Sequence, residues 1–262
     1  MCQAGEDCLQ DGDMMTPATW AVCSQPGCMT EADCTFAPPS TGAAPVTCGD
    51  PTDGMGMPPD RCYLDCAAGQ TCPDGMSCRN DSWCAWDAPS DTLLFDDFQT
   101  GDFSMGWTLN DVDGNTSFAD PSVDYVTDAW VVSDFIDGGA GSNLSAHSTS
   151  YYSPAAASDD WLISPQIMLG PNTRVYWYSQ SFSGAFPDGF ELRISTAGTA
   201  VADFEANPEL FSLAGEDTSY VLHIVDIAAA GYADQSVYLA WRNTTFDGWL
   251  LAVDNVAVAD FP

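Results

Sequence analysis

The chain divides into two parts that differ in how apolar and polar residues alternate. Residues 1–88 show almost no periodic apolar pattern and are rich in Cys, Pro, Gly, Met and Asp. From Leu93 onward, short segments alternate apolar and polar side chains, which is the period of a half-buried β-strand. We therefore expect an N-terminal domain at 1–88, a linker at 89–92 and a β domain at 93–262.

The β-type segments of the second part are separated by turn signals such as Pro187-Asp188-Gly189. The segment 190–194 alternates cleanly and would place Phe190, Leu192 and Ile194 on one face. Further strands are expected at 174–179, 220–227, 237–241 and 250–258, the last of them interrupted at Asp254. No segment shows a helical period, so many short strands predict an all-β sandwich or barrel.

All eleven cysteines lie in the first part, from Cys2 to Cys84. No C-x2-C pair occurs and the first ninety residues contain no His, which argues against a zinc site. Disulfides are the favoured interpretation, and they place the protein outside a reducing cytosol. We expect bonds whose pairing the spacing does not reveal, with Cys2 unpaired or intermolecular, among Cys8, Cys23, Cys28, Cys34, Cys48, Cys62, Cys66, Cys72, Cys78 and Cys84.

The odd cysteine count has two interpretations. A motif C-x-A-G-x-x-C occurs at Cys2–Cys8 and again at Cys66–Cys72. A longer array of Cys-rich units would supply an upstream partner, whereas a single free or intermolecular thiol needs none. No leader with a basic and an apolar region follows Met1, so in an exported protein the leader is removed or lies outside this numbering.

The charge balance is extreme, with 38 acidic residues against five basic ones and a formal net charge of −33. Such a surface repels nucleic acid and anionic membranes, so neither is an expected partner. No apolar run approaches the ~18–20 residues that span a bilayer, so membrane insertion is not expected either. The predominance of Asp fits loop-rich β structure, calcium sites or a saline habitat, and composition does not rank these.

Three ordered blocks carry a resemblance to a known family. They read LFDDFQTG at 94–101 with DVDGN at 111–115, SDDWLISP at 158–165, and VYLAWR at 237–242 with DGWLLAVDNV at 247–256. Their order and spacing resemble the cleaved-adhesin, or choice-of-anchor J, family of bacterial surface domains, which are similar to MAM-type domains. The resemblance covers about residues 93–260 and implies a jelly-roll β-sandwich with structural Ca²⁺. The Cys-rich part is similar, in composition alone, to segments of myxobacterial surface proteins.

The resemblance also implies which residues hold the Ca²⁺. In the family, an acidic residue near the first strand, one in the second block and one in the last strand come together. Carried over to this sequence, these residues are Asp96 or Asp97, Asp160 and Asp254. The chain departs from the family at Gln99, where Glu is usual, so either one carboxylate is lost or an amide oxygen takes its place.

Two features support cation binding from the residues themselves. Asp254 stands in an otherwise apolar segment, where a carboxylate is costly to bury unless it is paired or liganded. The run Asp111-x-Asp113-x-Asn115 offers three oxygens at alternate positions, but Gly lies at the fourth position instead of the sixth, so it is not an EF-hand. A second cation site and a plain turn both remain open for this run.

Catalysis has little support in the sequence. There is no G-x-S-x-G elbow and no Gly-rich phosphate loop, and the only histidines are His147 and His223. Among the aromatic residues, we expect Trp161 and Trp241 in the core. For Tyr151, Tyr152 and Trp249, both a core position and a ligand contact are open.

Two function hypotheses follow for a secreted or cell-surface protein of bacterial type. The first is a non-enzymatic, Ca²⁺-stabilised adhesin module that binds a glycan or a surface protein. The second is a structural subunit that assembles with copies of itself into a filament or surface layer. A net charge of −33 opposes self-association, so such assembly would depend on salt or divalent cations.

Overall fold

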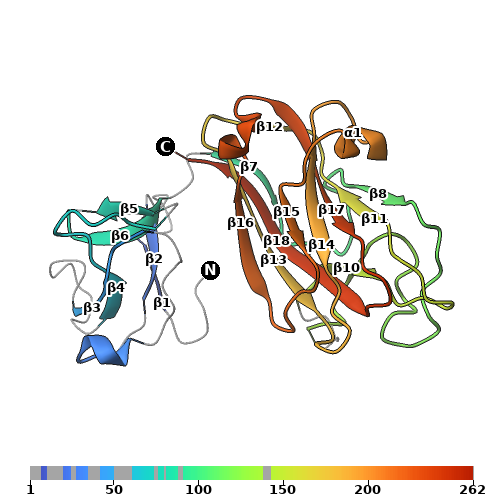
Figure 1. The fold of residues 1–262 in the computed structure, drawn as a ribbon, viewed down its shortest axis with the longest axis horizontal. Coiled ribbons are helices and arrows are strands. Elements are labelled where there is room, and N and C mark those ends of the chain that lie inside the picture. Colours follow the sequence, from blue (N-terminus) through green and yellow to red (C-terminus); the bar gives the residue numbers. More distant parts are fainter. Residues whose placement is uncertain are drawn as a thin grey trace. The chain divides into compact units, whose positions relative to one another are not determined.

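The computed structural model divides the chain into two compact units, Met1–Pro89 and Ser90–Phe261, which are described separately (Figure 1). The structure describes residues 7–10, 20–24, 28–34, 42–49, 61–73, 76–79, 81–87, 91–137 and 143–261, with backbone alone at 7–10, 20–24 and 86–87. Within these residues, no helix is long and apolar enough to cross a lipid bilayer.

The first unit is built from short strands and disulfide bonds. A four-stranded sheet has the order β1 (Asp7–Gln10), β2 (Trp20–Ser24), β6 (Trp83–Asp87), β5 (Met76–Arg79), and a two-stranded sheet joins β3 (Val46–Gly49) to β4 (Arg61–Leu64). A single 3-10 turn, η1 (Glu31–Asp33), precedes β3. The described disulfides are Cys28–Cys48, Cys34–Cys62, Cys66–Cys78 and Cys72–Cys84.

This unit is disulfide-rich, as expected, and its apolar core is small. Buried apolar residues form only small clusters around Trp83 and Leu64 in the described part. A core of this size does not offset the conformational entropy lost on folding, so the covalent bonds must supply much of the stability. The side chains of Cys2, Cys8 and Cys23 lie outside the described residues.

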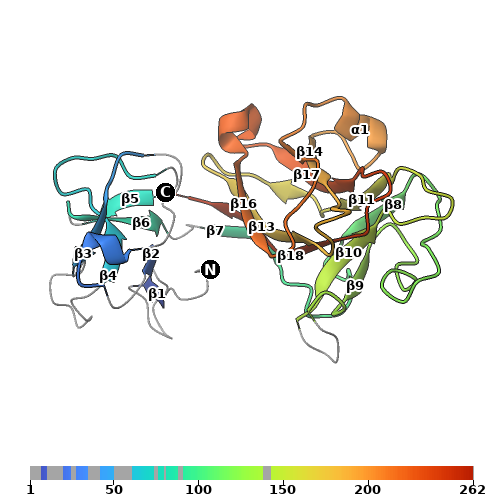
Figure 2. The same cartoon turned by 60° about the horizontal axis from the view of Figure 1, so that its bottom comes forward.

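The second unit is a jelly-roll β-sandwich, as expected, and Figure 2 shows its two sheets as layers. Every strand pair in it is antiparallel. The first sheet has the order β16 (Val221–Asp226), β13 (Arg174–Ser181), β18 (Leu250–Asp260), β10 (Ser145–Thr149), β9 (Val131–Ser133), with β7 (Asp91–Asp96) also paired to β18. The second has the order β15 (Phe211–Leu213), β14 (Phe190–Ser195), β17 (Ser236–Asn243), β11 (Asp160–Ile163), β8 (Thr108–Asp111), with β12 (Ile167–Met168) paired to β17.

The core between the sheets follows the predicted alternation. Phe190, Leu192 and Ile194 all face it and are fully buried. From the first sheet, Trp177 meets Trp241 of the second with ring centroids 5.9 Å apart. Each large aromatic ring removes much apolar surface from water, so these residues dominate the stability of the unit.

Trp161 is also buried, but in a separate cluster on the other face of the second sheet. It packs there with Ile163, Ala240 and Phe204 of the short helix α1 (Val201–Glu205). This helix and the π-type turn η2 (Ala228–Tyr232) are too short to show a helical period, which is why the sequence pattern did not reveal them.

Two strand boundaries differ from expectation. Strand β18 runs through Asp254 without the predicted interruption. The register against β13 shifts between Tyr176 and Tyr178, and Asn255 has φ 49°, so the irregularity is a bulge that the strand absorbs. Strand β7 begins at Asp91, inside the expected linker, because its first two residues pair with the end of β18.

The buried polar side chain of His147 lies on the face of β10 opposite to the core residue Ala146 and has no exposed surface. The hydroxyl of Tyr125 lies 2.6 Å from its Nδ1, and Ser145 Oγ lies 2.9 Å from its Nε2. Burial lowers the pKa of His147 from 6.5 to about 3, so the ring is neutral in the folded protein at neutral pH.

Acid is expected to destabilise the sandwich through His147. Between pH 6.5 and about 3 the unfolded chain takes up a proton at this residue that the folded chain does not. The free energy of unfolding contributed by His147 therefore falls as the pH drops, by an amount on the order of 4 kcal/mol over the full range. Urea unfolding of the protein and of His147→Gln at several pH values measures this.

The difference in unfolding free energy between the protein and His147→Gln should shift as the pH falls, because the variant lacks this titration. A difference that stays constant from pH 7 to pH 4 would contradict the assignment of a buried neutral imidazole.

Reduction is expected to unfold the first unit and to spare the second, because no cysteine follows Cys84. The described bonds span from 12 to 28 residues, and each loop of this length contributes about 3 kcal/mol through the unfolded chain. Amide hydrogen exchange of the intact chain, with and without a phosphine reductant, measures protection in both units. Equal loss of protection in peptides from 91–261 would contradict the independence of the sandwich.

Candidate functional site

Three aspartates converge at one edge of the second sheet. Asp111 ends β8 and Asp160 begins β11, and the antiparallel register places the two residues directly opposite each other. Asp113 follows in the next turn, and carboxylate oxygens of all three residues lie within 4.8 Å of one another. Strand pairing therefore brings two of the predicted cation ligands together, and the turn adds the third.

The turn after β8 is held by its own carboxylates. Asp111 Oδ1 accepts a hydrogen bond from the N–H of Gly114 at 2.6 Å, and Asp113 Oδ1 accepts one from the N–H of Asn115 at 2.6 Å. Gly114 has φ 65°, a conformation that favours glycine. Asp113 Oδ2 also accepts from the N–H of Asp159 at 2.6 Å, which ties the turn to the start of β11.

Asp160 is the buried member of the cluster, with 4% of its surface exposed. Its Oδ2 accepts hydrogen bonds from Tyr152 Oη at 2.9 Å and Ser158 Oγ at 2.8 Å, and a longer one from Ser148 Oγ at 3.4 Å. Burial raises the pKa of Asp160 to about 7, and the charges of Asp113 and Asp111 add to the rise although the hydrogen bonds oppose it. The folded chain thus concentrates negative charge here at a cost.

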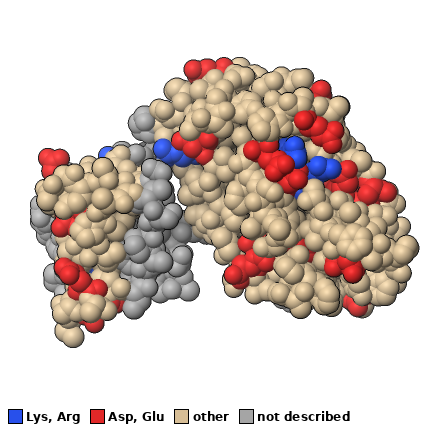
Figure 3. Space-filling model, in the orientation of Figure 1, with Lys and Arg blue, Asp and Glu red and all other residues tan. Residues whose placement is uncertain are grey.

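The arginines of the sandwich lie elsewhere and are already paired. Arg242 Nε lies 2.7 Å from Asp159 Oδ1, Arg193 Nε lies 2.7 Å from Glu191 Oε2, and Arg174 Nε lies 3.8 Å from Asp226 Oδ2. Figure 3 shows arginine side chains bordered by acidic ones on the face it displays. These three are the only basic residues other than His within 90–261, so no arginine of this unit is left to balance the aspartate cluster.

The donor set of the cluster fits Ca²⁺. It consists of carboxylate oxygens, which are hard donors of the kind this ion prefers, and it contains no imidazole or thiolate in the described part of the chain. The three oxygens approach closely enough to share one ion. Of the three residues, only Asp160 was implied by the family resemblance, and Asp111 and Asp113 were candidates from their spacing alone.

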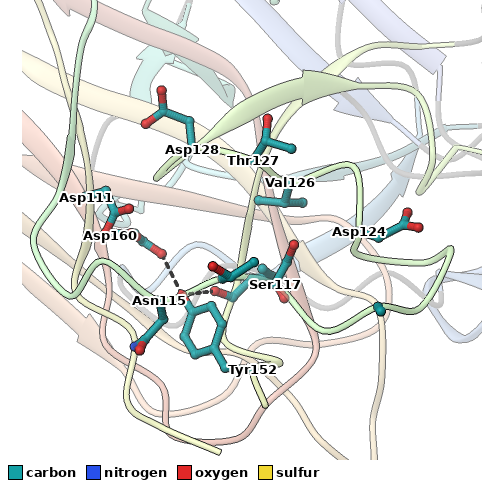
Figure 4. Close-up of a pocket in the computed structure, with 12 residues that line it drawn as sticks. Asp111, Asn115, Ser117, Asp124, Val126, Thr127, Asp128, Tyr152 and Asp160 are labelled. Atoms are coloured by element: carbon teal, nitrogen blue, oxygen red, sulfur yellow. Dashed lines mark hydrogen bonds between the residues drawn. The ribbon is translucent and has the colours of Figure 1, made fainter. Parts of the chain in front are cut away.

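A cavity of about 330 Å³ opens beside the cluster. Figure 4 shows Asp111 next to Asp160, and the hydroxyl of Tyr152 directed at the Asp160 carboxylate. The lining contains four aspartates and no Lys, Arg or His. It comprises Asp111, Asn115, Thr116, Ser117, Ala119, Asp124, Val126, Thr127, Asp128, Thr149, Tyr152 and Asp160.

Asp254 lies in a second acidic region, on the first sheet. Its Oδ2 accepts hydrogen bonds from Asn143 Nδ2 at 2.8 Å and from Asn255 Nδ2 at 3.0 Å, and its Oδ1 accepts from the Asn255 N–H at 2.7 Å. Burial raises the pKa of Asp254 to about 6, with smaller contributions from Asp137 and Asp97. Amide groups therefore surround this carboxylate.

Gln99, which stands where the family usually has Glu, also belongs to that region and acts through its amide nitrogen. Its Nε2 lies 2.9 Å from the carbonyl oxygen of Asp97, 3.0 Å from Asn143 Oδ1 and 3.0 Å from the carbonyl oxygen of Leu144. One amide nitrogen thus faces three oxygens, a place that suits a positive group. Unlike the Asp111 cluster, the described residues around Asp254 do not bring three carboxylates within 4.8 Å of one another.

The structure corrects the expected grouping of the acidic residues. Asp160 lies beside Asp111 and Asp113, whereas Asp254 lies near Asp97. The two carboxylates share no hydrogen-bond partner, since Asp160 is bonded to Tyr152, Ser158 and Ser148, and Asp254 to Asn143 and Asn255.

Asp96 belongs to neither acidic region. It is 2% exposed and accepts hydrogen bonds from the Phe98 N–H at 2.8 Å and from Trp107 Nε1 at 2.7 Å. Its carboxylate holds the turn after β7 and orients a core tryptophan, which is a structural role.

Several residues of the site were not singled out from the sequence. Ser158 could have been found from the sequence, since it stands two positions before Asp160 in the second block of the family resemblance. Ser148 and Asn143 carried none, because their contacts depend on which strands pair. Tyr152, for which core and ligand contact were both open, is 6% exposed and belongs to the Asp160 network.

Comparison with known proteins agrees with this architecture. The Cleaved Adhesin Domain family matches residues 91–258. A comparison with curated protein sequences finds no match.

Three solved structures illustrate the similarity of fold. The K3 cleaved adhesin domain of Lys-gingipain from Porphyromonas gingivalis W83 is 18% identical, with a TM-score of 0.46, over 65% of this chain and 98% of that domain. The K2 cleaved adhesin domain of Lys-gingipain is 20% identical, with a TM-score of 0.47, over 63% and 98%. TmCBM61, solved in complex with β-1,4-galactotriose, is 13% identical, with a TM-score of 0.42, over 65% and 99%.

The family match spans well over half of the chain and coincides with the jelly-roll unit. The chain belongs to the Cleaved Adhesin Domain family.

Proposed function

We propose that this protein is an extracellular, non-enzymatic adhesin-type module that binds a glycan on a bacterial or host surface and is stabilised by Ca²⁺. Membership of the Cleaved Adhesin Domain family supports the binding role. The disulfides of the first unit support a location outside the reducing cytosol.

The observation that carries the calcium part is the convergence of Asp111, Asp113 and Asp160. Three carboxylates within 4.8 Å repel one another, and the arginines of the unit are engaged elsewhere. A bound divalent cation would remove the repulsion and join the turn after β8 to the start of β11. In this role the ion holds the fold and takes no part in a reaction.

The non-enzymatic part rests on the chemistry of the described residues. The closest Ser–His pair is Ser145 and His147, and both are fully buried in the sandwich, where a substrate has no access. The cavity beside the aspartates offers carboxylates and hydroxyls, which suit binding of a cation or of hydroxyl groups.

Calcium is expected to raise the melting temperature of the sandwich, and a chelator is expected to lower it. At an ion concentration one hundred times the dissociation constant, the stabilisation is about 2.7 kcal/mol. Asp113→Asn should remove most of this response, because it deletes one carboxylate of the cluster and keeps the side-chain shape. Calorimetry of the full chain in Ca²⁺ and in EDTA measures the effect.

Asp254→Asn is the matched control, since it removes one negative charge from the other acidic region. It should retain the calcium response. Loss of the response in Asp254→Asn alone would place the ion in that other region, and a melting temperature that ignores both Ca²⁺ and EDTA would end the calcium proposal. Binding of the same protein to a glycan array tests the adhesin role separately.

A further inference from the structure

A group of aromatic side chains gathers at one end of the second unit, outside the main core between the sheets, and three of its rings also pack on the buried residues Val123, Val126 and Leu250. We name it the aromatic end surface and define it by its five residues, which come from four different loops. They are Phe118, Tyr151, Phe182, Phe186 and Trp249.

Strand pairing brings three of these loops to the same end. Thr149 at the end of β10 pairs with Leu250 at the start of β18, and Ser181 at the end of β13 pairs with Leu251. The segments 150–159, 182–189 and 244–249 therefore leave the first sheet at a common edge, at the lower end of the sandwich in Figure 1. The loop that precedes β9 adds Phe118, whose ring packs against Tyr151 in a tilted arrangement.

The rings form one continuous group around Trp249. Ring centroids lie 5.4 Å apart between Trp249 and Tyr151, 5.8 Å between Trp249 and Phe182, and 6.4 Å between Trp249 and Phe186. Phe118 lies 4.7 Å from Tyr151 and extends the group. Phe182 is 41% exposed and Phe186 is 52% exposed, so the group opens to solvent.

Buried hydrogen bonds hold Trp249 in place. Its indole Nε1 donates to Ser122 Oγ at 2.9 Å, and its backbone N–H donates to Asp188 Oδ2 at 2.6 Å. Asp188 is fully buried, and its other oxygen accepts a hydrogen bond from Ser150 Oγ at 2.6 Å. One carboxylate thus joins the loops that carry Tyr151, Phe186 and Trp249, so the rings are positioned before any ligand arrives.

The charge of these loops restricts the ligand. The segments 112–130, 150–159, 182–189 and 244–249 together contain seven Asp and no Lys, Arg or His. A polyanion would be repelled by this end of the protein. Sugar hydroxyls can donate hydrogen bonds to carboxylates, and the C–H faces of pyranose rings stack on aromatic rings.

We propose that the aromatic end surface binds an uncharged polysaccharide and discriminates against anionic ones. The inference rests on the adhesin function proposed above and adds the position of the ligand site and the class of glycan. Trp249 and Phe186 supply the stacking surface, and the carboxylates of the surrounding loops accept hydrogen bonds from the sugar.

A sugar chain fits this surface better than a protein partner does. A stable protein interface buries about 800 Å² on each partner and has an apolar centre. Here two of the five rings are more than one-third exposed, and aspartate-rich loops surround them. A limited, rigid aromatic surface with acceptors around it suits a narrow, hydroxyl-rich ligand.

Affinity electrophoresis of the full chain in native gels tests the proposal, with uncharged xylan, galactan, β-glucan and starch in one set and polygalacturonate and heparin in the other. Phe186→Ala and Trp249→Ala are compared with Phe95→Ala, an equally exposed phenylalanine on the outer face of β7. We expect retardation by at least one uncharged polysaccharide, a drop in affinity of tenfold or more in Phe186→Ala and Trp249→Ala, and no change in Phe95→Ala.

Each other outcome overturns a defined part. Unchanged glycan binding in Phe186→Ala would keep the glycan function and would rule out this surface as the binding site. The result is decisive even if Trp249→Ala misfolds, because the exposed Phe186 can be truncated without loss of core packing. Equal retardation by anionic polysaccharides removes the charge discrimination. If no polysaccharide binds, or if the protein binds a protein ligand and Phe186→Ala abolishes that binding, glycan binding is rejected in both proposals.

Discussion

The second unit depends on the pairing of strand β18, which bonds to three neighbours at once. It pairs with β13 along most of its length, with β10 at its start and with β7 at its end. Its first half contributes fully buried residues to the core, among them Leu251 and Val253. Because β18 closes the first sheet, it also fixes what its two ends carry. Trp249 precedes its first residue, and Asp254 lies at its bulge.

Electrostatics sets a second constraint, which the packing does not relieve. The sandwich has three arginines for many aspartates, and each arginine is committed to an ion pair with an acidic partner. The two acidic regions respond differently. Around Asp254 the N–H groups of Gln99, Asn143 and Asn255 face the oxygens, so neutral amides stand in for positive charge. Around Asp160 the oxygens of two further aspartates converge, and burial with these charges raises the pKa of Asp160 to about 7, so the Ca²⁺ proposed above would relieve a repulsion that the fold retains.

The strands were predictable because alternation is a local property of the chain. Alternation within the five residues 190–194 predicted one shared face for Phe190, Leu192 and Ile194, and the structure buries all three. The meeting of Asp160 with Asp111 was not local, since it follows from the register of β8 against β11. The family resemblance grouped Asp160 with Asp254, whereas the structure places Asp160 beside Asp111 and Asp113 and Asp254 in the other sheet. The aromatic end surface could not be predicted from the sequence either, because its five rings come from four loops that strand pairing brings together.

Two adjacent tyrosines connect the acidic cluster to the aromatic surface. Tyr152 directs its hydroxyl to Asp160 at 2.9 Å and is nearly buried, whereas the ring of Tyr151 packs between Phe118 and Trp249. The short segment after β10 therefore touches both places. The Ca²⁺ proposed above would hold Asp160 in place and, through the hydrogen bond from Tyr152, would also limit the freedom of the neighbouring Tyr151. On this proposal, an ion at the aspartates would support binding at the aromatic surface by limiting the motion of its rings, without contacting the ligand.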